Sequence, residues 1–148
     1  MGFVSMSIRP YSQQSTVSWM KCNNVEGLQG QGLLFYVKGC TIAEVYEWLT
    51  TFLADLHVVY QHGTTYIYEG KYHDYIETIS LKSFEEDSFL EIAIASFPTH
   101  LPWKTDVDFA RSGFCYFKRE VRCIPVQPHY PGEYLIINEH GEQLVDWN

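Results

Sequence analysis

The fold is decided by residues 41–56, TIAEVYEWLTTFLADL, and by the strand patterns on either side of them. Thr41 can cap a helix, and Glu44 three residues later completes a capping box. Apolar residues then recur at helical spacing and form a stripe roughly 120° wide. The stripe consists of Ile42, Val45, Tyr46, Leu49, Phe52, Leu53 and Leu56. The pattern predicts one long amphipathic helix over residues 42–56, packed on a sheet.

Strand patterns surround this helix. Before it, we expect strands at residues 16–22 and 33–37, joined by a glycine-rich loop over residues 23–32. After it, β-branched, aromatic and alternating residues predict strands at 58–60, 64–68, 75–81, 89–97, 120–126, 134–137 and 143–147. A short helix begins near Thr105, which has Asp108 three residues later. This order predicts an α+β fold with a mostly antiparallel sheet, one long amphipathic helix and one short helix.

The composition fits one globular domain that spans residues 1–148. Hydrophobic residues make up 46% of the chain and aromatic residues 16%, so a core rich in aromatic rings is expected. The formal net charge of −8 disfavours direct binding to a phosphate backbone and suits a basic protein surface. A charge of this size also keeps a small domain soluble without any partner.

The chain shows no sign of export or of membrane insertion. Residues 1–10 lack a basic start that leads into a long apolar run, so no secretory signal is predicted. No segment approaches the roughly 18 consecutive apolar residues of a transmembrane helix. The predicted location is therefore cytoplasmic, where Cys22, Cys40, Cys115 and Cys123 are expected to be reduced, buried thiols.

The motifs that could carry chemistry point to no catalytic or metal site. The glycine-rich loop at residues 23–32 leads into a strand and not into a helix, so it does not form a phosphate loop. His62, His73 and Asp74 would hold a metal only if their two β segments bring them together, and histidines scattered in turns are far more common. Cys115 lies between aromatic residues, which suits a core thiol better than a reactive thiolate. We expect no enzyme, no cofactor and no metal.

An acidic region that also carries tyrosines is the main candidate for a binding surface. From Glu69 to Asp108 the sequence has nine acidic residues against three lysines. Tyrosine next to carboxylates suits an interface hot spot with a charged rim. We expect Tyr66 and Tyr68 to face outward with Ile67 facing the core; the alternative is that these tyrosines face the core. The candidate partner-binding residues are Tyr66, Tyr68, Glu69, Tyr72, Asp74, Glu85, Glu86 and Asp87.

Four segments in the last third of the chain carry a resemblance to a known kind of protein. They are DVDFAR (106–111), VRCIP (121–125), YLII (134–137) and LVDW (144–147). Together they resemble the endings of small bacterial immunity proteins from contact-dependent and polymorphic toxin systems. That family shares no catalytic motif, so the resemblance transfers no functional residue. It implies a single-domain acidic inhibitor that holds a cognate toxin, often a nuclease, in the cytoplasm.

Three hypotheses about function follow from the sequence. The first is a non-catalytic immunity protein that covers the basic active-site surface of its toxin. The second is a small-ligand-binding or enzymatic α+β domain with an aromatic pocket between helix and sheet. The third is a phage or assembly accessory protein that self-associates through a sheet edge. The identity of the partner and the oligomeric state stay open.

Overall fold

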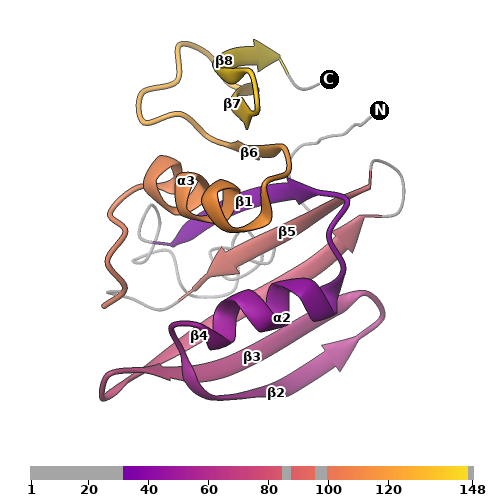
Figure 1. Ribbon diagram of the computed structural model, residues 1–148, viewed down its shortest axis with the longest axis vertical. Coiled ribbons are helices and arrows are strands. Elements are labelled where there is room, and N and C mark those ends of the chain that lie inside the picture. Colours follow the sequence, from indigo (N-terminus) through magenta and orange to yellow (C-terminus); the bar gives the residue numbers. More distant parts are fainter. Residues whose placement is uncertain (1–31, 85–87, 96–99, 147–148) are drawn as a thin grey trace.

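The computed structural model describes residues 32–84, 88–95 and 100–146 of the 148-residue chain. In these residues, eight strands form one sheet in the order β2-β3-β4-β5-β1-β6-β7-β8, and every neighbouring pair is antiparallel (Figure 1). The strands are β1 (Leu33–Lys38), β2 (Ala54–His62), β3 (Thr65–Tyr72), β4 (Tyr75–Phe84), β5 (Phe89–Ile94), β6 (Val121–Cys123), β7 (Glu133–Asn138) and β8 (Gly141–Asp146). The helices are α2 (Ile42–Thr50) and α3 (Asp106–Phe117). The predicted α+β class with an antiparallel sheet is confirmed.

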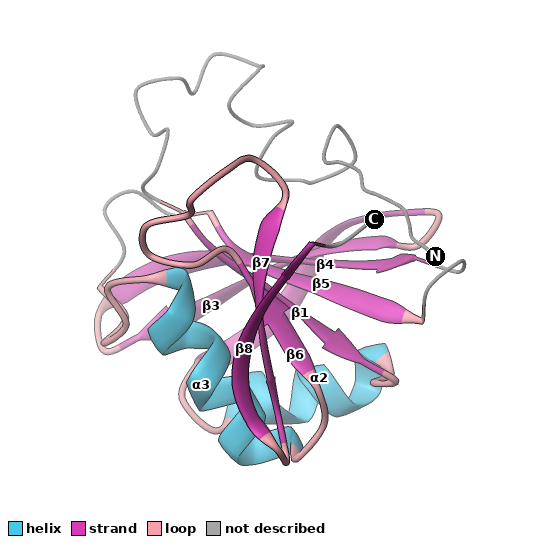
Figure 2. Cartoon of the chain, turned by 90° about the horizontal axis from the view of Figure 1, so that it is seen from above, coloured by secondary structure: helices cyan, strands magenta, loops and turns pink. Residues whose placement is uncertain are grey.

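Both helices lie on the same face of the sheet, which we call the helix face (Figure 2). Each helix begins at the threonine that the sequence indicates. The Thr41 hydroxyl accepts a hydrogen bond from the Glu44 backbone at 3.1 Å, and the Glu44 carboxylate accepts one from the Thr41 backbone at 2.9 Å. The Thr105 hydroxyl accepts a hydrogen bond from the Asp108 backbone at 3.1 Å. These bonds satisfy donors that a helix start otherwise leaves unpaired.

The prediction of one long helix over residues 42–56 is not confirmed. α2 ends at Thr50 after nine residues, and residues 54–62 form β2. The hydroxyls of Thr50 and Thr51 each donate to the carbonyl oxygen three residues earlier, at 2.6 Å. Such local bonds compete with further helix propagation. Leu53 and Leu56 still pack in the core. Leu53 lies in the loop between α2 and β2, and Leu56 lies in β2, so residues at helical spacing can reach the core without forming a helix.

Other element boundaries also differ from the predictions. α3 has 12 residues, so the helix expected to be short is longer than α2. The strand expected over residues 120–126 is limited to Val121–Cys123. Pro125 follows closely and cannot donate a backbone hydrogen bond to a neighbouring strand. The strand expected at residues 16–22 lies outside the described residues.

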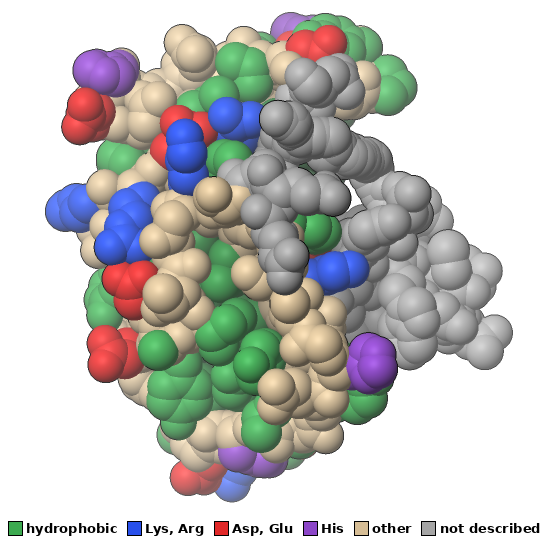
Figure 3. Space-filling view, turned by 90° about the vertical axis from the view of Figure 1, so that its right-hand side faces the viewer, with side chains coloured by type: hydrophobic (Ala, Val, Ile, Leu, Met, Phe, Trp, Pro, Cys, Tyr) green, Lys and Arg blue, Asp and Glu red, His purple; other side chains and the backbone are tan. Residues whose placement is uncertain are grey.

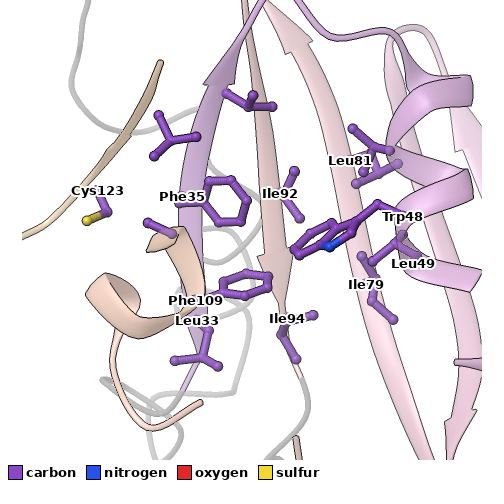
Figure 4. Packing of buried hydrophobic residues seen from close by; sticks show 14 of the residues in the cluster. Leu33, Phe35, Trp48, Leu49, Ile79, Leu81, Ile92, Ile94, Phe109 and Cys123 are labelled. Carbon is purple, nitrogen blue, oxygen red and sulfur yellow. The ribbon is translucent and has the colours of Figure 1, made fainter. Parts of the chain in front are cut away.

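The core lies between the helix face and the two helices. Phe35 from β1, Trp48 from α2 and Phe109 from α3 meet there, and each is at most 3% exposed (Figure 4). The Phe35 ring lies 4.8 Å from the Phe109 ring and 5.9 Å from the Trp48 ring, edge-on to both. Gly113 of α3 crosses directly over Phe35, and a Cβ atom at this position would overlap the tip of the ring. The close approach of α3 to β1 therefore requires glycine at this position.

The capping box of α2 gives a first stability prediction. Thr41→Ala removes the hydroxyl that accepts from the Glu44 backbone, and should lower the free energy of unfolding by about 1 kcal/mol in urea denaturation. The matched control is Thr50→Ala, at the exposed end of the same helix, with an expected change below about 0.5 kcal/mol. An equal decrease in the free energy of unfolding in the two variants would contradict a capping role for Thr41.

Candidate functional site

The structure separates the predicted partner-binding residues. Tyr66, Tyr68 and Tyr72 lie on the helix face of β3, because Tyr68 pairs with Ile79 and Tyr66 with Leu81, both core residues of β4. Glu69 lies on the opposite face of the sheet, and Asp74 lies in the turn between β3 and β4. Glu85, Glu86 and Asp87 lie outside the described residues. The described candidates thus do not form one continuous surface.

The predicted orientation of β3 is wrong. Tyr68 is 7% exposed and belongs to the core, Tyr66 packs against the core, and Ile67 points to the opposite face. Alternation along a strand shows that neighbouring side chains face opposite ways, but not which face is covered. Here α2 covers the tyrosine side, since Tyr46 of α2 contacts Tyr68 with ring centroids 5.8 Å apart.

The structure brings three tyrosines together between α2 and β3, and we call Tyr46, Tyr66 and Tyr68 the tyrosine cluster. The rings of Tyr66 and Tyr68 are stacked with centroids 6.4 Å apart. The Tyr46 hydroxyl donates to the carbonyl oxygen of Leu56 at 3.4 Å. Burial raises the pKa of Tyr68, and the nearby hydroxyls of Tyr66 and Tyr46 raise it further. These contacts hold the rings in place while leaving part of the cluster open to solvent.

The exposed part of the cluster is apolar with an acidic neighbour. Tyr46 is 38% exposed, Tyr66 is half-buried, and Val58 of β2, which pairs with Tyr68, is 48% exposed. Figure 3 shows hydrophobic side chains gathered in the lower half of the face that it draws, the half of the molecule that contains α2, β2 and β3 in Figure 1. Glu47 follows Tyr46 in α2, is exposed, and has no ion-pair partner among the described residues. Sequence reasoning missed Tyr46 because its helical spacing assigned it to the buried stripe.

The three arginines in the described ranges are each bound to a glutamate. Shortest N–O distances are 2.8 Å for Arg111 to Glu142, 3.0 Å for Arg119 to Glu44 and 2.9 Å for Arg122 to Glu120. Hydrogen bonds from Arg111 and Arg119 lower the pKa of Glu142 and of Glu44. These carboxylates compete with any phosphate that approaches the same guanidinium groups.

The residues weighed as a metal site lie apart. His62 pairs with Thr65 at the start of β3, whereas His73 and Asp74 follow the end of that strand. No group of three His, Cys, Asp or Glu side chains that could hold a metal ion occurs in the described part of the chain. No helix in that part is long and apolar enough to span a membrane.

The three cysteines that the structure describes differ in exposure, contrary to the prediction that all are buried, and Cys22 lies outside the described residues. Cys123 is buried, and its burial raises the pKa of the thiol to about 12. Cys40 is partly exposed and Cys115 is exposed, and all three are free thiols. The prediction of a core position for Cys115 is wrong, because α3 turns this residue to solvent while Phe109 and Gly113 face the sheet.

Comparisons with protein-family models, curated proteins and solved structures found no match.

Proposed function

We propose that this chain is a non-catalytic immunity protein, which neutralises a cognate toxin by covering the toxin's basic active-site surface. The observation that carries the proposal is the partly exposed tyrosine cluster on a chain of net charge −8. A tyrosine ring buries a large apolar area on binding and its hydroxyl keeps a hydrogen-bonding group, which is why tyrosine is enriched at hot spots.

The charge distribution supports a basic partner. Arg111, Arg119 and Arg122 are already bound to glutamates. Glu47, which follows Tyr46 in α2, has no ion-pair partner in the part of the chain that the structure describes. An exposed acid at the rim of an apolar patch attracts a positively charged surface and speeds its association. A nuclease toxin offers such a surface, because its active site must hold phosphate groups. The proposal therefore extends to a nuclease as the toxin.

The tyrosine cluster gives a binding prediction, which is tested with a purified candidate nuclease toxin as the binding partner. Tyr66→Ala and Tyr46→Ala should each weaken binding about tenfold, since each removes a ring from the contact. Glu47→Lys should slow association at low salt, with a smaller effect at high salt. Binding is measured by surface plasmon resonance, and protection by survival of a bacterial host that expresses both proteins.

Two matched controls lie far from the cluster. Tyr130→Ala removes a tyrosine that is 45% exposed in the loop before β7, and should leave affinity unchanged. Glu139→Lys reverses an exposed charge in the turn between β7 and β8, and should leave the association rate nearly unchanged. Equal effects of the control and cluster variants would refute the assigned surface. Absence of both binding and protection by the unmodified chain would refute the immunity role against that toxin.

A further inference from the structure

The face of the sheet opposite the helix face, which we call the second face, is buried at its centre. Five neighbouring strands each place one residue in a row across this face. In the order from β2 to β1, the row consists of Tyr60, Ile67, Ser80, Ala93 and Leu34. Tyr60 is 53% exposed, whereas Ser80 and Ala93 are both 0% exposed. Ile67 and Leu34 are partly buried, so burial rises from the β2 end of the sheet toward its centre.

The same contrast occurs along β4. Ile76 and Ser80 both point to the second face, because they alternate with the core residues Ile79 and Leu81. Ile76 is 58% exposed, although it lies only four residues from the completely buried Ser80. An antiparallel sheet commonly leaves one face to solvent, as the second face does at Ile76. The complete burial of a serine and an alanine at the centre of that face therefore requires a layer of atoms above them.

The elements that the structure describes do not supply this layer. All eight described strands belong to the sheet itself, and both described helices lie on the helix face (Figure 2). The loop between β6 and β7 reaches the second face near the start of β5, where Ile124 packs against Phe89 and Tyr134. Ala93 lies four residues farther along β5, which is about 13 Å at the usual rise of a strand. A different part of the chain must cover Ser80 and Ala93.

The length of chain before β1 identifies the segment that can form the layer. The burial is found in a single chain, so the layer belongs to the chain itself. Outside the described ranges, residues 85–87, 96–99 and 147–148 are too short to cover several strands that lie about 4.8 Å apart. Residues 1–31 can extend over as much as about 100 Å. They also lead directly into β1, the strand that carries Leu34 of the buried row.

Charge and composition also suit a contact between residues 1–31 and the second face. This segment contains two basic residues, Arg9 and Lys21, and one acidic residue, Glu26. Since the whole chain has a net charge of −8, the rest of the chain carries −9 and attracts a segment of net charge +1. The second face itself holds a completely buried carboxylate, Glu91, in β5. Large apolar side chains in the segment, such as Trp19, provide the area that such a cover buries.

We propose that residues 1–31 of this chain dock on the second face and cover its centre, from Ile67 on β3 to Leu34 on β1. The contact is intramolecular and needs no toxin, so this proposal is independent of the immunity role. A docked segment closes the centre of the second face to other proteins. The tyrosine cluster lies on the helix face and stays accessible, so the two faces of the sheet have different roles.

Photo-cross-linking of the full chain tests the docked segment. In two variants, the photoreactive residue p-benzoylphenylalanine replaces either Ile67 or Lys82, both on the second face. Dilute protein is irradiated, the monomer is digested, and the cross-linked residues are identified by tandem mass spectrometry. Both variants should cross-link to residues 1–31. In the matched control the same photoreactive residue replaces Cys115, which is exposed on α3, and it should give at least about tenfold fewer cross-links to residues 1–31. Thermal unfolding shows whether each variant is folded.

Three results would overturn the proposed cover. One is a folded second-face variant that forms no cross-link to residues 1–31. Another is a set of cross-links that join two copies, since the cover would then come from a second chain. The last is a control at position 115 that cross-links to residues 1–31 as often as the second-face variants do. If neither second-face variant folds, nuclear Overhauser effects between the Ala93 methyl group and residues 1–31 are measured in the unmodified chain, and their absence would equally refute the cover.

Discussion

Replacing Trp48 with alanine is expected to lower the free energy of unfolding by about 3–5 kcal/mol, because it opens a cavity in the core. Trp48 is 3% exposed. Its ring centroid lies within 6.4 Å of the ring centroids of four other residues. These are Phe35 in β1, Tyr116 and Phe117 in α3, and Trp103 in the segment before α3. It joins α2 to the rest of the aromatic core. Urea denaturation followed by far-UV circular dichroism measures the loss without relying on tryptophan fluorescence.

Trp48→Phe is the control for the cavity argument. Phenylalanine keeps a ring in the same space, so this variant should lose clearly less stability than Trp48→Ala. If Trp48→Ala lowered the free energy of unfolding by less than about 1 kcal/mol, position 48 would behave like an ordinary surface position. The packing described for α2 would then be wrong.

The second large effect is expected at Gly113, where alanine should destabilise a helix that it would ordinarily stabilise. Inside a helix, alanine is favoured over glycine by about 1 kcal/mol. Here the added Cβ overlaps the tip of the Phe35 ring, and Phe35 is fully buried between Trp48 and Phe109. The expected net loss in the free energy of unfolding is about 1–3 kcal/mol, the usual cost of overpacking a core.

A double-mutant cycle tests whether the clash is the cause. Phe35→Leu removes the far end of the ring, so Gly113→Ala should cost less in that background than in the unmodified chain. Cys115→Ala is the control on the same helix, since Cys115 is exposed and its replacement should change stability by less than about 0.5 kcal/mol. Strict additivity of the Phe35 and Gly113 changes would show that the two residues do not collide.

Features set by neighbouring residues were predictable from the sequence. The two helix starts at Thr41 and Thr105 were predicted correctly, because each capping bond joins a side chain to a backbone group three residues away. The end of α2 was not predictable in the same way. Residues 54–62 become a strand because they pair with β3, and this pairing outweighs their helical spacing.

The candidate site was only partly predictable, because it depends on packing between distant residues. Tyr66 and Tyr68 were selected from the sequence, but their orientation depends on which face of the sheet α2 covers. Tyr46 joins them from another element, and no local pattern distinguishes a half-exposed residue at the edge of an apolar stripe from a buried one. The buried row on the second face depends on strand order, which the sequence pattern left open.

The central position of β1 has a consequence for synthesis on the ribosome. β2 to β5 follow one another as adjacent hairpins and can form as soon as they emerge. β1 precedes them in the chain, yet its neighbours are residues 89–94 on one side and 121–122 on the other. The apolar residues of β1 therefore stay exposed until most of the polypeptide has left the exit tunnel, because only then can both neighbouring strands pair with β1. Nascent chains stalled before β6 should consequently be the most sensitive to proteases and the most dependent on chaperones.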